Sequence, residues 1–234
     1  MLLDEKLAKG SDMELLVATL AHTARNNDDE GTTRLRLISD TIQNAPGLVN
    51  IRMYRSREPE SYYFILTTWE DEELWFKAHD RYNPKNLLRA SAGELLTDSS
   101  EQWLMHYLWG YSRPSAQPVI AAAHIINVRP DQAERVERGW IEGLRRQVTQ
   151  PELAFGFLAR GRNEDNSLLH NSQFLQNPAF NEPQIGNYTS NFLNVLSWPG
   201  ETQRKDFYAD QHYKAISGFL SSVGVMRMLA LEPL

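Results

Sequence analysis

The chain has no cysteine among its 234 residues. This absence excludes disulfides, zinc–thiolate sites, iron–sulfur clusters and cysteine nucleophiles. The chain also lacks an excess of positive charge, because its formal net charge is −6. A general nucleic-acid binder is therefore not expected, since such proteins neutralise phosphates with lysine and arginine.

Long hydrophobic runs are missing as well. No stretch of about 18 uninterrupted apolar residues occurs, so neither a transmembrane helix nor a membrane partner is expected. Residues 1–12 mix charged side chains with leucines and lack the apolar centre of a secretory signal. Together with the absence of cysteine, these features predict a cytoplasmic protein.

An internal repeat organises what is present. Residues 16–24 read LVATLAHTA and residues 118–126 read PVIAAAHII, and each strand-like segment carries one histidine, His22 and His124. A helical pattern of apolar residues follows each segment, and Pro130 suits the first turn of the second helix. We interpret the two histidines as equivalent positions of two copies of one unit.

The copies continue in parallel beyond the first helix. After a turn comes one strand, then a second strand that ends in tryptophan, Trp69 or Trp198, and then a helical region and a last strand. The order β-α-β-β-α-β is typical of ferredoxin-like units. We predict a first repeat over 1–112, a linker over 113–117 and a second repeat over 118–234, with an insertion at 163–188 that we interpret as a lid.

Three predicted strands are apolar at nearly every position, namely 17–21, 62–66 and 119–123. A sheet with one wet face should alternate apolar and polar residues, so both faces of these strands should be buried. The fold class expected is α+β, with two ferredoxin-like repeats whose sheets pack face to face as an intramolecular α/β barrel. The gap between the sheets is the predicted pocket.

Several residues are candidates for contact with a substrate, and each has a structural alternative. His22 and His124 lie on central strands, where a histidine can act as a base or form hydrogen bonds in the core. Trp69 can simply seal the core at its strand end. His79 and His212 lie on helix faces, where exposure is the usual state. No carboxylate motif lies nearby, so no metal site is expected.

The chain resembles the antibiotic biosynthesis monooxygenase family of the dimeric α/β-barrel superfamily. The resemblance depends on the proline-opened helix, on the strand that ends in Trp69 or Trp198, and on the following helix with its aromatic residue and histidine. Members of that family usually form their barrel from two chains, whereas this chain supplies both halves. A homodimer of the fused barrel is a further expectation.

The resemblance implies catalytic residues in the second half. Quinone-forming members use an asparagine four residues before the strand-end tryptophan, and Asn194 and Trp198 match that spacing. Tyr208 and Arg227 are the counterparts of a helix tyrosine and a last-strand arginine of the same site. The first half departs from the pattern, because Ile65 stands where the asparagine would be.

The implied function is a cofactor-independent, quinone-forming monooxygenase that acts on a small aromatic or polyketide-like substrate with O2 as co-substrate. Asn194 would polarise a substrate oxygen while Trp198 packs against the ring. Two alternatives stay open. One is a haem-binding or haem-degrading barrel, in which His79 is the candidate ligand. The other is a barrel that binds a ligand without catalysis.

Overall fold

The computed structural model describes residues 14–23, 28–57, 61–97, 100–148, 153–162 and 190–234. The predicted lid at 163–188 and residues 1–12 lie outside this described part. Within it, eight strands are present: β1 Leu15–Thr23, β2 Leu48–Ser56, β3 Ser61–Trp69, β4 Glu101–Ser112, β5 Ile120–Val128, β6 Phe155–Gly161, β7 Ser190–Trp198 and β8 Gly224–Pro233. Their order along the chain is the predicted one.

Helices separate the strands at the predicted places. The described helices are α2 Asp28–Ile42, α3 Glu72–Tyr82, α4 Pro84–Ala92, the 3-10 turn η2 Gly93–Leu95, α5 Pro130–Gln147, α7 Glu201–Ala209 and α8 Gln211–Val223. The second helical region of each repeat is thus divided into two helices. None of the described helices is long and apolar enough to cross a membrane.

Local sequence signals explain where these helices begin. Asn83 ends α3 and caps α4, since its side chain accepts a hydrogen bond from the Lys85 backbone N–H at 2.9 Å. Asp210 does the same between α7 and α8 and accepts from the backbone N–H groups of His212 and Tyr213. Pro130 occupies the first turn of α5, as predicted.

The strands form one sheet in the order β1-β3-β2-β8-β5-β7-β6-β4, and the order is circular because β4 also pairs with β1. The pairings of β1 with β3 and β4, of β2 with β3 and β8, and of β7 with β5 and β6 are antiparallel. The predicted fold class, α+β with two ferredoxin-like repeats in one chain, is confirmed. The packing of the two sheets face to face stays a prediction.

The compact units of the structure differ slightly from the two repeats. One unit contains Tyr107–Met228, and the other contains residues 14–106 together with Leu229–Leu234. The end of β8 therefore groups with the first repeat, where Tyr54, Arg55 and Ser56 of β2 pair with it. An ion pair between Arg55 and Glu232 lies in the same strand pair. Each last strand is shared between the units.

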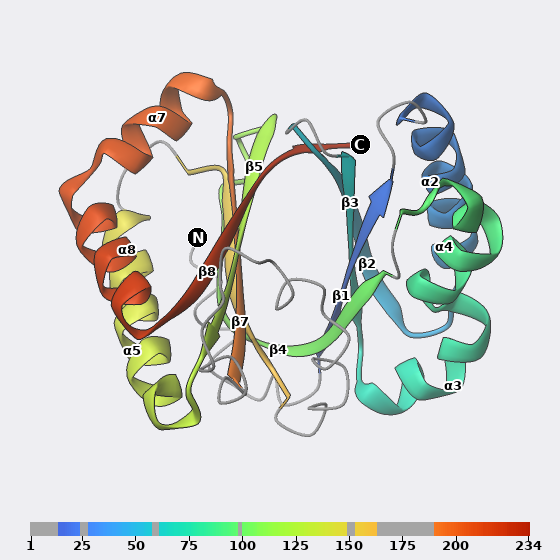
Figure 1. Ribbon diagram of the computed structural model, residues 1–234, viewed down its shortest axis with the longest axis horizontal. Helices are drawn as coiled ribbons and strands as arrows, with labels where there is room; N and C mark the ends of the chain where they lie inside the picture. Colours follow the sequence, from blue (N-terminus) through green and yellow to red (C-terminus); the bar gives the residue numbers. More distant parts are fainter. Residues whose placement is uncertain (1–13, 24–27, 58–60, 98–99, 149–152, 163–189) are drawn as a thin grey trace. The chain divides into compact units, whose positions relative to one another are not determined.

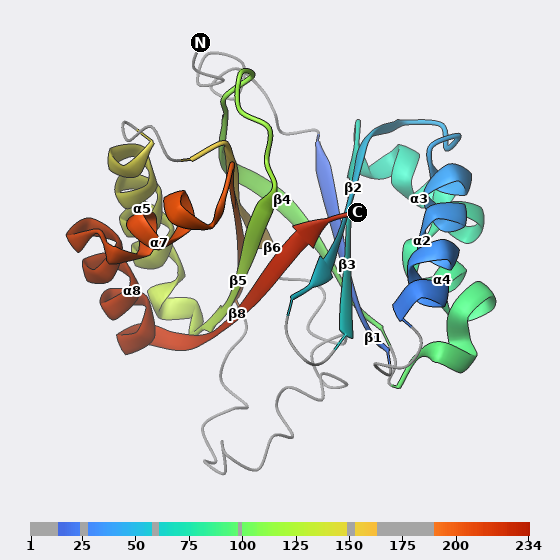
Figure 2. The ribbon, with the colours of Figure 1, turned by 90° about the horizontal axis from the view of Figure 1, so that it is seen from above.

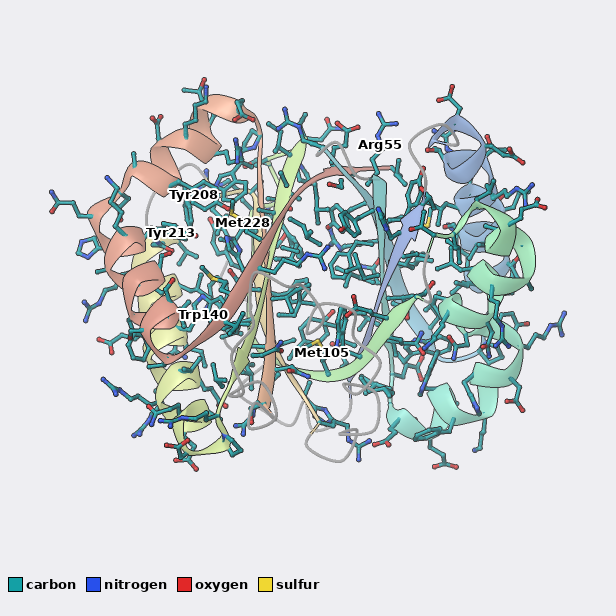
Figure 3. All side chains as sticks on the ribbon, in the orientation of Figure 1. Arg55, Met105, Trp140, Tyr208, Tyr213 and Met228 are labelled. Carbon is teal, nitrogen blue, oxygen red and sulfur yellow. The ribbon has the colours of Figure 1, made fainter. Side chains whose placement is uncertain are left out.

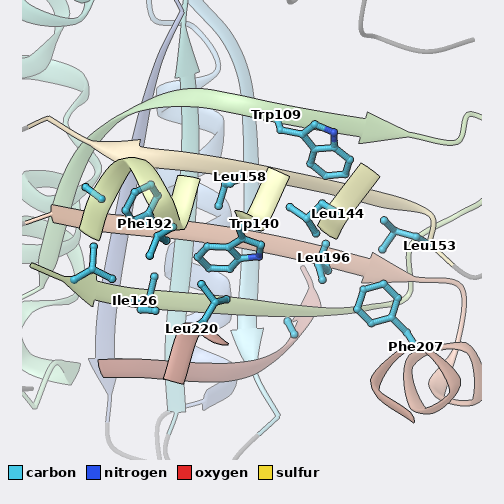
Figure 4. Packing of buried hydrophobic residues seen from close by; sticks show 14 of the residues in the cluster. Trp109, Ile126, Trp140, Leu144, Leu153, Leu158, Phe192, Leu196, Phe207 and Leu220 are labelled. Carbon is cyan, nitrogen blue, oxygen red and sulfur yellow. The ribbon is translucent and has the colours of Figure 1, made fainter. Parts of the chain in front are cut away.

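In each unit the helices cover one face of that unit's strands (Figures 1 and 2). α2, α3 and α4 lie beside β1, β2 and β3, while α5, α7 and α8 lie beside β5, β6 and β7. The predicted helical stripes face inward: Leu35, Ile38 and Ile42 are buried in α2, as are Ala133, Val136 and Trp140 in α5. Figure 4 shows the buried cluster under α5, with Trp140 and Leu144 lying over the strands.

The three apolar strand segments are buried almost throughout. Residues 17–21, 63–66 and 120–123 are each at most 8% exposed, as predicted for central strands. Two residues depart from this prediction: Tyr62 is only partly buried, and Val119 is 55% exposed because β5 begins only at Ile120. The backbone turn before β2 requires Gly47, which has a φ of 79° and leaves no room for a Cβ beside Leu74.

Candidate active site

A buried polar cluster lies between the strands and the helices of the unit formed by residues 107–228. Its centre is His124 on β5, which is 2% exposed. The phenol oxygens of Tyr208 and Tyr213 lie 3.1 and 3.2 Å from the same nitrogen, His124 Nε2. Figure 3 labels Tyr208 on α7, Tyr213 on α8 and Trp140 on α5, the three helices that cover this part of the sheet.

The break between α7 and α8 brings the two tyrosines together. Tyr208 is near the end of α7, and Tyr213 is in the first turn of α8 after the Asp210 cap. Their ring centroids are 4.7 Å apart in an edge-to-face arrangement that aromatic rings favour. Both rings point toward the sheet, so both hydroxyl groups lie within hydrogen-bond distance of the same imidazole nitrogen.

Asn194 lies beside His124, since the two residues are direct partners in the pairing of β5 with β7. Its amide nitrogen donates a hydrogen bond to the carbonyl oxygen of Phe157 at 2.7 Å, so the buried amide is partly satisfied. The Asn194 side chain also lines a cavity with His124 and Tyr213. The side chain of Asn194 is thus anchored to β6 at the edge of that cavity.

Trp198 packs against Tyr208 of the tyrosine pair. It is fully buried, and its ring lies 5.5 Å from Tyr208 and 5.3 Å from Phe207. Its indole N–H has no hydrogen-bond partner among the described residues. The sequence thus predicted three residues, Asn194, Trp198 and Tyr208, that the structure brings into one cluster with His124.

Burial decides the protonation states of the cluster. Desolvation lowers the pKa of His124 to about 4, although the backbone of Asn194 acts in the opposite direction. Burial raises the pKa of Tyr213 to about 12, and the Ser217 side chain reduces that effect. Burial and the neighbouring Tyr213 also raise the pKa of Tyr208, while Arg204 lowers it. At neutral pH the imidazole and both phenols are therefore uncharged.

Arg204 is the nearest described cation to the tyrosine pair. Its guanidinium carbon is 5.7 Å from the centre of the Tyr208 ring. Glu201 holds the guanidinium, with an Nε to Oε1 distance of 3.1 Å, and this ion pair raises the pKa of Arg204. The pair is itself neutral overall, so the cluster stays an uncharged polar site within an apolar core.

The cavity at the cluster is small. It has about 10 Å³ of room for the centre of a water molecule, which is space for about one water. Its lining comes from the sheet and from α5, α8 and β8: His124, Trp140, Leu144, Gln147, Asn194, Tyr213, Ile216, Ser217, Leu220 and Met226. This cavity lies between the sheet and the helices, whereas the pocket that we predicted in the gap between the two sheets stays a prediction.

The predicted equivalence of His22 and His124 is wrong. In β3, Trp69 pairs with Leu15, and in β7, Trp198 pairs with Ile120. His22 is seven residues beyond Leu15, whereas His124 is four residues beyond Ile120. Side chains alternate between the faces of a strand, so the two histidines point to opposite faces of their sheets.

The true counterpart of His124 in the first repeat is Thr19, which pairs with Ile65, the counterpart of Asn194. Thr19 accepts a hydrogen bond from the Gln102 amide at 2.9 Å, and the same nitrogen lies 2.8 Å from the side-chain oxygen of Asn83. His22 itself lies 2.6 Å from the Thr97 hydroxyl and stacks on Tyr62. The first repeat therefore has no second copy of the cluster.

The other predicted residues lie apart from the cluster. Trp69 is fully buried against Trp75, and His79 on α3 lies 2.6 Å from the carbonyl oxygen of Phe76 and 3.1 Å from Asp80. His212 lines an outer groove with Glu142 and Arg146. Their roles in substrate binding stay predictions.

Arg227 follows the cavity residue Met226 directly in β8. Since neighbouring side chains of a strand point to opposite faces, Arg227 is directed away from the cavity. The last-strand residue at the cavity is therefore Met226, and the catalytic role predicted for Arg227 has no support from this geometry.

Sequence reasoning missed Tyr213 and Gln147. The sequence predicts a helical region here without marking its break, and in an unbroken helix Tyr208 and Tyr213 would not share a face. The signal that could have placed Tyr213 is Asp210, a residue type that favours helix N-caps. Gln147 falls in the last turn of α5, where a polar residue is ordinary, and no signal in the sequence marks it as buried.

Comparisons with known proteins agree with this fold. The model of the antibiotic biosynthesis monooxygenase family matches residues 16–82, so the resemblance to that family is confirmed for this segment of the first repeat. A search of curated proteins found no match. The second repeat, which carries the cluster, lies outside the matched segment.

Solved structures resemble nearly the whole chain. A candidate monooxygenase from Fusobacterium nucleatum superposes with a TM-score of 0.71 at 8% identity, and the match covers 96% of this chain and 94% of that one. An anthrone oxidase-like protein gives a TM-score of 0.68 at 11% identity, with 96% and 92% covered. A candidate chlorite dismutase gives 0.54 at 12% identity, with 94% and 95% covered. At these identities the similarity establishes the fold, a monooxygenase-type α+β fold, and not the activity.

Proposed function

We propose that the protein is an oxygenase that converts a small aromatic, polyketide-like substrate to a quinone with O2 as co-substrate and without a bound metal or flavin. The observation that carries this proposal is the pair of phenol groups on one buried imidazole nitrogen, next to Asn194. These groups can take up a proton and stabilise a substrate oxygen. The anthrone oxidase-like structure among the similar folds supports the choice of chemistry.

The reaction needs little more than proton transfer and charge stabilisation. An anthrone-type substrate carries a CH2 group between its rings, and removal of one proton gives an electron-rich anion. This anion reduces O2, forms a C–O bond to give a hydroperoxide, and loses water. The balance is one CH2 group and one O2 giving one C=O group and one water, so the substrate supplies all the electrons.

Neutral His124 is the candidate general base in this scheme. An unprotonated Nε2 has one lone pair, so it accepts a hydrogen bond from one phenol at a time and leaves the other O–H available. Tyr208 and Tyr213 stay protonated at neutral pH and can donate to the oxygen on which the negative charge of the substrate anion develops. Asn194 has a second amide N–H for the same oxygen.

Haem is the cofactor that the alternative function requires, and the described residues do not fit it. The cavity at His124 has space for about one water, and Nε2 of His124, which would have to bind the iron, is already in contact with Tyr208 and Tyr213. Both ring nitrogens of His79 face polar neighbours, Phe76 O and Asp80. The larger groove near Lys85 and Arg89, of about 370 Å³, has no histidine in its lining. We therefore derive no step through haem.

A ligand-binding module without catalysis is the second candidate, because the buried hydrogen-bonding groups of His124, Tyr208 and Tyr213 could hold a ligand without reacting with it. A ring system can enter only if side chains at the cavity, such as Ile216 and Met226, move aside. For either function we propose a small aromatic ligand as partner, a homodimer of the fused chain and a cytoplasmic location. Neither nucleic acid nor a membrane is a proposed partner.

Oxygen uptake with 1,8-dihydroxyanthrone tests the proposal, with quinone formation followed by absorbance and the uncatalysed rate subtracted. We expect the wild-type protein to accelerate both signals in a 1:1 ratio. The variant His124→Gln should lose about 10²- to 10⁴-fold in rate, the usual contribution of a general base. The control His106→Gln, at an exposed histidine of β4, should retain the wild-type rate.

Two results would contradict the oxygenase proposal. One is a wild-type rate equal to that of the buffer, and the other is an equal rate for the wild type and His124→Gln. Binding of the quinone product without turnover would identify the second candidate function.

A further inference from the structure

Gln147 is a buried amide without a hydrogen-bond partner. The residue is 2% exposed at the end of α5, and neither its amide oxygen nor its amide nitrogen is bonded within the described part of the chain. Buried polar groups in proteins are almost always paired, because an unpaired one keeps its full desolvation penalty. Two unpaired atoms on one side chain therefore require an explanation.

The place of Gln147 gives that explanation. It lines the same cavity as His124 and Asn194, on the helix layer that faces them. Leu144, Leu220 and Met226 form much of the remaining lining and offer no polar partner. Gln147 is thus part of the wall of a space whose polar lining includes His124, Asn194 and Tyr213 of the proposed active site.

The other repeat contains a glutamine whose amide nitrogen is paired. Gln102 is near Thr19, the counterpart of His124, and its amide nitrogen bonds to Thr19 and to Asn83. That amide connects a strand to the α3–α4 junction, which is a structural task. Gln147 has no comparable partner, so a role in holding the fold does not account for it.

We propose that Gln147 binds the polar edge of the ligand. A side-chain amide presents one acceptor and one donor side by side, so it is complementary to a ligand edge with a hydroxyl next to a carbonyl oxygen. Resting on the proposed function, this makes Gln147 the residue that selects ligands with a hydroxyl group peri to the ring carbonyl over ligands without one. Ser217, also in the cavity lining, is placed beside the same edge.

Binding of two naphthoquinones tests this assignment without any turnover. The probes are 5-hydroxy-1,4-naphthoquinone, which has the peri hydroxyl, and 1,4-naphthoquinone, which lacks it. The chain has no cysteine, so thiol adducts of the quinones do not arise. Isothermal titration gives the Kd of each probe for the wild type and for Gln147→Met, a change that keeps the length of the side chain and removes its polar atoms.

We expect opposite effects on stability and binding. Gln147→Met should raise the Tm of the ligand-free protein by about 2–4 °C, because it removes unpaired buried groups. It should weaken binding of the hydroxyquinone about 10- to 100-fold, the effect of lost buried hydrogen bonds, and leave binding of the unsubstituted quinone unchanged. The matched control Gln102→Met should lower the Tm, because it removes paired groups.

Each other outcome overturns the assignment. A Tm that stays the same or falls in Gln147→Met would mean that the amide is structural or bound only to a buried water. Equal affinity of the wild type for both probes, or binding of neither, would exclude recognition of the peri hydroxyl. Selective binding of the hydroxyquinone by a wild type that does not oxidise the anthrone would refute the oxygenase proposal alone.

Discussion

The buried histidine of the cluster predicts how the stability of the protein depends on pH. An unfolded chain protonates this imidazole near its ordinary pKa of 6.5, whereas burial lowers the pKa of His124 in the folded protein to about 4. Between these values the unfolded state binds more protons than the folded state. The free energy of unfolding should therefore fall as the pH is lowered through this range.

The size of the effect follows from the pKa difference. A shift from 6.5 to about 4 corresponds to about 3 kcal/mol in total. Between pH 7 and pH 5 the contribution of His124 should amount to a loss of about 2 kcal/mol, because the folded state stays unprotonated there. Tyr208 and Tyr213, the titratable groups that face the imidazole, have raised pKa values and do not titrate in this range.

Urea unfolding at pH 7 and pH 5, followed by tryptophan fluorescence, measures this loss. In His124→Gln the pH dependence should be smaller than in the wild type by about 2 kcal/mol, since glutamine can accept a hydrogen bond from a tyrosine but cannot be protonated. The exposed His106→Gln variant should keep the wild-type pH dependence. An unchanged pH dependence in His124→Gln would refute our account of a neutral, desolvated imidazole.

Two further predictions concern packing. Gly143→Ala should destabilise the protein by about 1–3 kcal/mol in urea unfolding, because the new Cβ would lie 2.1 Å from Ile216, whereas Gly218→Ala, with open space around it, should be neutral or stabilising. Trp69→Phe should cost about 1 kcal/mol more than Trp198→Phe in the same assay, because only the indole N–H of Trp69 is hydrogen-bonded. Equal losses in either pair would contradict the reasoning.

The fold was predictable because its signals repeat and are local. The apolar strands and helical stripes predicted from the sequence are present in the structure. Gly47 and Pro130 lie at the turn and at the helix start that these residues indicate. The tryptophans at the ends of β3 and β7 are equivalent positions of the two repeats, as predicted. Each of these signals depends on a residue and its near neighbours in the chain.

The site was harder to predict because it depends on register and on a helix break. The alignment that made His22 and His124 equivalent was wrong by three residues. A shift by an odd number of residues moves a side chain to the other face of its strand. Asp210 lies where α7 ends and α8 begins, and this break places Tyr213 beside the imidazole of His124. The burial of Gln147 depends on how α5 lies on the sheet, which no local pattern records.

The two repeats use the same positions for different purposes. The first repeat has Thr19, which accepts a hydrogen bond from Gln102, where the second has His124, an uncharged imidazole with two phenols at one nitrogen. Evolution of a stable core favours paired or apolar groups, so the unpaired Gln147 and the desolvated His124 in the second repeat are costs to stability. Such costs are typical of sites where a ligand completes the hydrogen bonds. The first repeat has a paired threonine, Thr19, at the position of His124, so the second repeat is the half to probe for chemistry.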